Sequence, residues 1–142
     1  MKRTTPIEIP GLKRGLHASV DKEVPFEWTI AHFNAALPPV LSTPAMIGMM
    51  EVAASHALRA ALPPGFISVG TRIEVDHLKA VPAGTRVVAS AKLTRRRGRF
   101  LEFEVEARAG RHVIGRGKVF RAVVEPKAFQ AKASTRTGSH TG

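Results

Sequence analysis

The 142-residue sequence contains no cysteine, no tyrosine and a single tryptophan. Without cysteine, the chain can form no disulfide framework, no thiolate metal site and no cysteine nucleophile. Aromatic residues make up only 6% of the chain, which makes a stacking platform for nucleic-acid bases difficult to assemble. These absences exclude the disulfide-rich and thiol-dependent classes of protein and weigh against nucleic-acid binding.

The chain also lacks a long uninterrupted apolar run. Its first residues, MKRTTPIEIPGLKRG, are basic but are not followed by the apolar stretch of a secretory signal. The segment from Trp28 to Met50 carries no Lys, Arg, Asp or Glu, but prolines, His32 and Asn34 interrupt it, whereas a membrane-spanning helix needs about 20 apolar residues. We therefore expect no membrane contact and a cytoplasmic location.

Positive charge, in contrast, is abundant. The chain has 22 Lys and Arg residues against 11 Asp and Glu, for a net charge of +11, which favours anionic partners. The charge is concentrated, with +3 on residues 1–14, +3 on residues 126–142 and +4 on the arginines at positions 95, 96, 97 and 99. This arginine cluster is either a solvated turn or a phosphate clamp. Because the rest of the chain is nearly neutral, the pattern suits a local phosphate contact better than a nucleic-acid surface.

One long helix is expected, over residues 45–62. Thr43 is a suitable N-cap, Pro44 suits the first helical position, and the run Pro63-Pro64-Gly65 stops the helix. Strand-like runs precede and follow this helix, at residues 16–24, 67–80, 85–94, 100–109 and 112–124. The order predicts an α+β fold in which one antiparallel sheet of about five strands packs against the helix.

The length is that of a single domain. We place the folded domain at residues 11–125. A flexible N-terminal segment, residues 1–10, would precede it, and a polar, flexible C-terminal tail, residues 126–142, would follow it.

Glu51 is a single charged residue in the apolar part of the predicted helix. It shares a stripe with Ile47, Ala54 and Leu58, and no cation lies three or four positions away to pair with it. A carboxylate in apolar surroundings is suited to act as a general base or a nucleophile. The alternatives are that Glu51 faces solvent or pairs with a distant arginine.

His77 and Thr43 are the other polar candidates. Strand alternation places His77 on the same face as Ile73 and Val75. If the helix packs across that face, Glu51 and His77 would approach each other or meet across a subunit boundary. The alternative is a core histidine bonded to a backbone carbonyl. Thr43, at the start of the helix, offers a hydroxyl beside free backbone N–H groups, where an oxyanion would be stabilised.

No pattern in the sequence indicates a metal or a cofactor. The six histidines show neither the HExxH motif nor another clustered spacing for zinc. The run Gly115-Arg116-Gly117 lacks the following helix and the third glycine of a dinucleotide-binding loop. We therefore expect no cofactor and no bound metal.

Three segments carry a resemblance to a known family. Residues 43–51 read TPAMIGMME, residues 68–77 read SVGTRIEVDH, and residues 115–123 read GRGKVFRAV. Together they resemble the hotdog-fold acyl-CoA thioesterases of the fluoroacetyl-CoA thioesterase type, with a threonine, a glutamate and a histidine in the family's order. The third segment is similar to the family's last strand and includes Arg121. The resemblance covers roughly residues 10–129.

This resemblance implies a fold, an assembly and a set of site residues. The fold would be a hotdog, a curved antiparallel sheet wrapped around the central helix, in a homodimer with active sites at the subunit interface. Thr43, Glu51 and His77 would be the catalytic residues, and Gly70 and Arg121 would bind substrate. The backbone N–H of Gly70 would polarise the substrate carbonyl.

These observations predict an acyl-CoA thioesterase that hydrolyses a small or short-chain acyl-CoA to the free acid and CoA. Glu51 would attack the thioester carbon or activate a water, His77 would assist proton transfer, and Thr43 would orient the carboxylate. Phe33 and Leu37, which precede the helix, are candidate walls of the substrate pocket. The alternatives are a noncatalytic acyl-CoA-binding module of the same fold and a basic nucleic-acid-binding protein.

Overall fold

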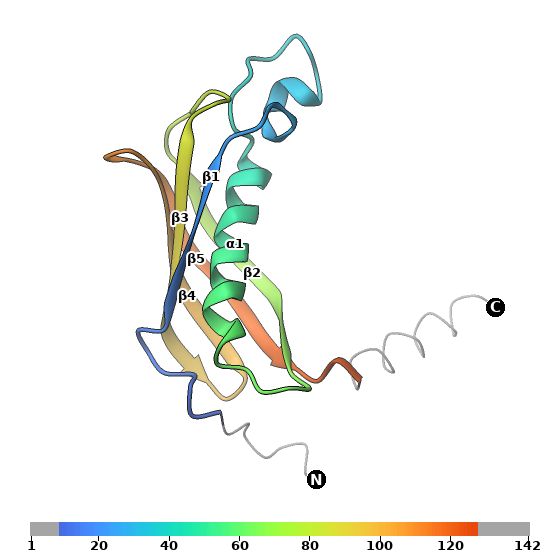
Figure 1. The fold of residues 1–142 in the computed structure, drawn as a ribbon, viewed down its shortest axis with the longest axis vertical. Helices are drawn as coiled ribbons and strands as arrows, with labels where there is room; N and C mark the ends of the chain where they lie inside the picture. The colour runs from blue at the N-terminus through green and yellow to red at the C-terminus, as the bar shows by residue number, and fades with distance from the viewer. Residues whose placement is uncertain (1–8, 128–142) are drawn as a thin grey trace, which may run out of the picture.

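The structure, a computed structural model, describes residues 9–127 of the chain. Residues 1–8 and 128–142 lie outside the described residues, and with them most of the two segments predicted to be flexible. The described backbone contains one long helix and a five-stranded sheet, as the sequence predicts (Figure 1). No helix within residues 9–127 is long and apolar enough to cross a membrane.

The elements follow in the order strand, long helix and then four strands. They are β1 (His17–Glu23), α1 (Thr43–Arg59), β2 (Ile67–His77), β3 (Arg86–Arg97), β4 (Phe100–Ala109) and β5 (His112–Val124), with two 3-10 turns, η2 (Phe26–Trp28) and η3 (Ile30–His32), between β1 and α1. The bounds of β4 and β5 match the prediction. β2 ends earlier than expected, whereas β3 continues to Arg97 because Arg95, Arg96 and Arg97 pair with β4.

Ser42, not Thr43, caps the N-terminus of α1, which corrects the assignment made from the sequence. Ser42 has an extended backbone, with φ −75° and ψ 153°, and its Oγ accepts a hydrogen bond from the N–H of Ala45 at 3.2 Å. An N-cap needs this extended conformation, whereas Thr43 is already helical. Helix α1 also ends earlier than predicted, at Arg59. The hydroxyl of Thr43 is therefore available to another partner.

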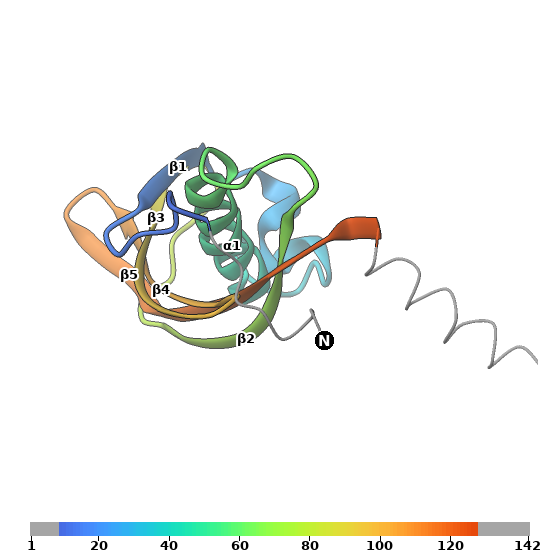
Figure 2. The same ribbon diagram turned by 90° about the horizontal axis from the view of Figure 1, so that it is seen from below.

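The sheet is antiparallel throughout, in the order β1-β3-β4-β5-β2, and curls around α1 (Figure 2). Side chains along β3 and β4 alternate between buried and exposed, so one face of each strand packs on the helix. α1 lies closest to β1 and β3 and contacts β2 and β5 less. The largest core side chains include Met46, Met50, Leu58, Leu93, Phe103 and Ile114. This arrangement confirms the predicted hotdog fold.

β2 forms one edge of the sheet and exposes much of its length. It spans 11 residues and pairs with β5, and within residues 9–127 no other strand pairs with it. The stretch from Gly70 to Glu74 is exposed, and Ile73 in it is 38% exposed. On α1, Val52 is 45% exposed. A long edge with exposed apolar side chains is a surface that proteins usually cover.

The capping role of Ser42 can be tested by stability measurements. Replacing Ser42 with Ala should lower the free energy of unfolding by about 1 kcal/mol, whereas Ser42→Gly should cost only a few tenths, because glycine is a better N-cap than alanine. Urea denaturation followed by circular dichroism measures both. Equal losses for the two variants would contradict this assignment.

Candidate active site

α1, β2 and β5 bring the predicted site residues together in two groups. At the start of α1, Thr43 meets His77 at the end of β2. Further along α1, Glu51 meets Arg121 of β5 and Gly70 of β2. α1 and β2 therefore run in opposite directions past each other, so the beginning of the helix lies beside the end of the strand.

The first group joins a hydroxyl to an imidazole. Thr43 Oγ1 lies 2.8 Å from His77 Nδ1. The other ring nitrogen of His77, Nε2, is buried and has no hydrogen-bond partner within residues 9–127. Buried polar atoms are nearly always bonded, so an orphaned imidazole nitrogen is a position at which a ligand atom is expected. The partner of Nδ1 is a side-chain hydroxyl, not the backbone carbonyl that a core histidine would use.

The second group is an ion pair in a largely buried setting. Arg121 Nη1 donates to Glu51 Oε1 at 2.7 Å, and the side chains of Arg121 and Glu51 are 10% and 28% exposed. Of the alternatives open for Glu51, the structure shows the distant arginine, which lies 70 positions later in the chain. A carboxylate on an apolar helix face is stabilised by such a partner, because the opposite charge offsets the loss of hydration.

Ser68 holds the arginine of this pair in place. Arg121 Nε donates to Ser68 Oγ at 2.9 Å, and Nη2 donates to the Ser68 carbonyl at 3.1 Å. All three guanidinium nitrogens are therefore bonded within the protein. Arg121 is only 8% exposed, so it is not placed as a surface cation for a phosphate.

Gly70 lets the backbone of β2 approach the carboxylate. A Cβ atom at position 70 would lie 2.7 Å from Glu51 Oε2 and 3.7 Å from Arg121 Nη1. The register of β2 against β5 shifts between Gly70 and Arg72, so the strand is irregular at this point. A side chain at position 70 would require the Glu51 carboxylate to shift from its place beside Arg121.

Within one chain the two groups are separated. Thr43 and Glu51 lie eight positions apart on α1, a rise of about 12 Å, and Gly70 and His77 lie seven positions apart on β2, about 23 Å along the strand. No hydrogen bond or ion pair joins Glu51 to His77 in the part of the chain that the structure describes. The fold of a single chain thus builds two half-sites.

Phe33 and Leu37, predicted as pocket walls, lie at the surface of the single chain. Phe33 is 75% exposed and Leu37 is 41% exposed. The ring of His32 stands edge-on to Phe33 and to Phe26, with centroid distances of 5.6 and 6.1 Å. These rings form an exposed aromatic row beside the entry to α1, away from Glu51.

Sequence reasoning missed Ser68 and misassigned the partner of Thr43. Ser68 and Gly70 alternate onto one face of β2, but only the pairing register places that face against Arg121. Similarly, Thr43 lies 34 positions before His77, and nothing local indicates their contact. Both contacts depend on how α1 crosses the sheet.

Comparisons with known proteins place these residues in a family context. The family model of the fluoroacetyl-CoA-specific thioesterases matches residues 24–127, which include both half-sites. A fluoroacetyl-CoA thioesterase from Streptantibioticus cattleyicolor is 36% identical over 133 residues, 89% of this chain and 96% of that enzyme. A threonine-to-serine variant of a fluoroacetyl-CoA thioesterase, solved with acetyl-CoA, is 35% identical, with a TM-score of 0.82 over 88% of this chain and 98% of that one. A hot-dog-like protein from Thermanaerovibrio acidaminovorans is 27% identical, with a TM-score of 0.80 over 87% of this chain and 91% of its own.

The close approach at Gly70 predicts opposite effects of alanine at two glycines. Gly70→Ala should lower the free energy of unfolding by about 1–3 kcal/mol, because the new Cβ overlaps the Glu51 carboxylate. Gly48→Ala is the matched control. A Cβ there meets nothing within 4 Å, and alanine in a helix should stabilise the protein by up to about 1 kcal/mol. Urea denaturation of both variants checks the contrast, and a neutral Gly70→Ala would refute the close approach.

Proposed function

Because the chain belongs to the family of fluoroacetyl-CoA-specific thioesterases, we propose that it hydrolyses a short-chain acyl-CoA to the free acid and CoA, with Glu51 as the reacting group. The observation that carries this assignment is the Glu51 carboxylate. It lies on an inner helix face, where Arg121 bonds to Oε1 and Oε2 lies at the place that a side chain of residue 70 would take. A two-carbon acyl group is the proposed size, since one relative is named for fluoroacetyl-CoA and another was solved with acetyl-CoA.

Glu51 has one oxygen available for chemistry. Oε1 accepts the hydrogen bond of Arg121, which leaves Oε2 facing Gly70. Oε2 removes a proton from water as the water oxygen bonds to the thioester carbon, or it attacks that carbon itself. The carbonyl oxygen then carries the negative charge, and the backbone N–H of Gly70 is the proposed donor to it. Collapse of this intermediate breaks the C–S bond and releases the thiolate of CoA. On the water route the free acid is formed directly, whereas direct attack leaves an acyl-Glu51 anhydride, which a water then hydrolyses to the free acid and the Glu51 carboxylate.

His77 is the proposed acid that protonates the leaving thiolate. In the imidazolium form, Nδ1–H donates to Thr43 Oγ1, and Nε2, the buried nitrogen without a partner within residues 9–127, gives its proton to the thiolate and leaves a neutral imidazole. Thr43 then orients His77, in place of the role on the carboxylate suggested by the sequence. Arg121 likewise becomes a positioning residue for Glu51, because its nitrogens are bonded to Glu51 and Ser68.

The role of Glu51 predicts a large loss of activity on neutralisation. Glu51→Gln should lower kcat for acetyl-CoA by at least about 100-fold, since general base catalysis contributes on this scale. Thiol release measures the rate. Glu104→Gln, which removes an exposed carboxylate from the opposite face of the sheet, is the control and should keep wild-type turnover. Unchanged turnover in Glu51→Gln would remove this residue from the mechanism.

A homodimer would complete the site, and we propose that its subunits pair through β2. The unpaired edge of β2, exposed Ile73 and exposed Val52 supply a surface for a second copy. Antiparallel pairing about a two-fold axis sets the second half of one β2 beside the first half of the other. His77 of one chain then lies at the same end of the interface as Gly70 and Glu51 of its partner.

Such a dimer makes a prediction about mixed subunits. Glu51→Gln and His77→Ala should each be inactive alone. If each active site takes Glu51 from one chain and His77 from the other, a heterodimer of the two variants contains one intact site. Random reassembly of equal amounts should then recover roughly a quarter of wild-type turnover. Absence of any recovery, with heterodimers verified by mass spectrometry, would place both residues of a site in one chain.

A further inference from the structure

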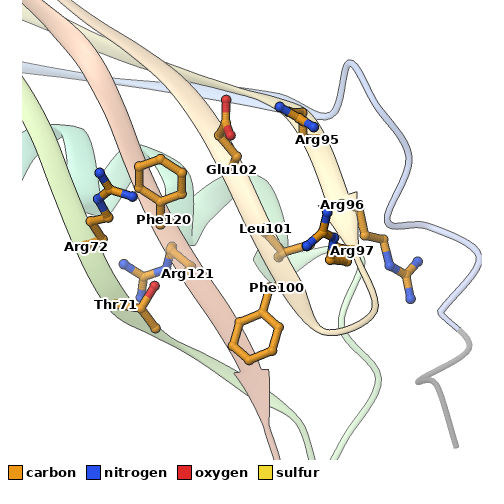
Figure 3. A pocket seen from close by; sticks show the side chains of 10 residues that line it. All are labelled: Thr71, Arg72, Arg95, Arg96, Arg97, Phe100, Leu101, Glu102, Phe120 and Arg121. Carbon is orange, nitrogen blue, oxygen red and sulfur yellow. The ribbon is translucent and has the colours of Figure 1, made fainter.

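A cavity of about 510 Å³ opens on the face of the sheet that points away from α1 (Figure 3). It is lined by residues of β2, β3, β4 and β5. The proposed hydrolysis uses only Arg121 among its lining residues, so most of this surface has no role in the chemistry described above.

The strand register brings the lining side chains into two rows. In the first, Arg72 lies opposite Phe120, Phe120 opposite Glu102, and Glu102 opposite Arg95. The pairing register of β3 with β4 shifts between Leu93 and Arg95, and after this shift Arg95 lies opposite Glu102.

The second row lies next to the hairpin between β3 and β4. Phe100 of β4 lies opposite Arg97 of β3. Figure 3 shows Phe100, Phe120, Glu102 and Arg72 on the same side of the ribbon, with α1 behind it. Because residues two apart on a strand share a face, Arg95 and Arg97 belong to one surface with Phe100 and Glu102.

Two of the arginines at this surface have no counter-charge among the described residues. Glu102 is already paired with Lys118, whose Nζ lies 3.1 Å from Glu102 Oε2, and Arg72 is paired with Glu74. For Arg95 and Arg97, in contrast, no ion pair or hydrogen bond is found among residues 9–127. Unneutralised guanidinium groups beside a cavity favour an anion, and phosphate suits their fork geometry.

Arg96, which lies between Arg95 and Arg97 in the sequence, has a different role. Its Nε donates to the Gly98 carbonyl at 2.8 Å, and its Nη1 lies 3.3 Å from the Ile9 carbonyl. These contacts tie the first described residues to the hairpin. Arg96 is therefore a structural residue, and the anion site comprises Arg95 and Arg97.

Aromatic rings complete the chemistry of the cavity. Phe100 is 52% exposed, and the guanidinium groups of Arg99 and Arg72 lie over Phe100 and Phe120 at 5.3 and 5.2 Å from the ring centroids. An exposed aromatic ring does not help to bind an inorganic anion, whereas a nucleobase that stacks on the ring binds more tightly. Phosphates together with a planar base are the chemistry of a nucleotide.

The cavity also borders the residue that holds the proposed reacting group. Arg121, which holds Glu51, lines one end of it together with Thr71. From β5 to β3 the distance is two strand spacings, about 10 Å. We propose that this cavity binds the phosphorylated adenine nucleotide of the acyl-CoA substrate, with Arg95 and Arg97 on its phosphates and Phe100 against its base. The proposal rests on the proposed acyl-CoA hydrolysis.

Truncated substrates test this assignment. In Arg95→Gln/Arg97→Gln, KM for acetyl-CoA should rise roughly tenfold with little change in kcat, because phosphate contacts are lost away from the reacting atoms. The kcat/KM for S-acetyl-N-acetylcysteamine, which has no nucleotide, should stay at the wild-type value. Arg116→Gln, which removes the same charge elsewhere on this face, is the matched control and should leave both substrates unaffected.

A binding measurement separates this proposal from the proposed hydrolysis. Adenosine 3′,5′-bisphosphate, titrated into the full-length protein by calorimetry, should bind wild type and Arg116→Gln, and should bind Arg95→Gln/Arg97→Gln and Phe100→Ala at least several-fold more weakly. If wild type hydrolyses neither thioester, the proposed hydrolysis fails while this titration still tests the cavity.

Three results would overturn the assignment. The first is an unchanged KM for acetyl-CoA in Arg95→Gln/Arg97→Gln. The second is an equal loss of kcat/KM on both thioesters. The third is binding of the bisphosphate that is equally tight in wild type and in all of these variants.

Discussion

The ion pair between Glu51 and Arg121 is the interaction on which the proposed site depends. A carboxylate on the inner face of a helix is costly to desolvate, and a single cation offsets that cost only when its own donors are satisfied. Ser68 meets this condition by accepting from two nitrogens of Arg121, which leaves the third for Glu51. Gly70 is the steric counterpart, because any side chain there would displace the carboxylate. Removing Arg121 would leave the Glu51 carboxylate without its cation, and removing Ser68 would leave two guanidinium nitrogens of Arg121 without their acceptors.

The two faces of the sheet have different proposed roles: the inner face holds the reacting groups, and the outer face binds the phosphates of the substrate. On the inner face, each polar group near α1 has a specific partner or, in the case of His77 Nε2, an open position for a ligand atom. On the outer face, Arg95 and Arg97, which have no counter-charge within residues 9–127, line a cavity together with the exposed ring of Phe100. A thioester that reacts at the inner face and carries its phosphates on a long flexible arm suits this division. The edge strand β2 borders both faces, so a partner chain on that edge would contact both.

Much of the fold could be predicted from the sequence because local signals were strong and agreed. Pro44 and the run Pro63-Pro64-Gly65 bracket the helix, and strand-like runs separated by turn residues correspond to the five strands. The cap was the exception. Ser42 and Thr43 are both good N-cap residues, and only the backbone conformation distinguishes them. Glu51 and His77 could be singled out because each interrupts an apolar pattern, but their partners could not be identified, since both come from segments distant in the chain.

The sequence alone determined the layout of elements, the concentration of charge at one hairpin, and the presence of a carboxylate and an imidazole on apolar faces. Each of these properties follows from the spacing of residue types within a short stretch of the sequence. Only the tertiary structure decided that Arg121 binds Glu51, that Thr43 bonds to His77, and that one chain holds these groups apart. The reason is the register of an antiparallel sheet. It sets which residues of β2 and β5 lie side by side, and no pattern within either strand contains that information.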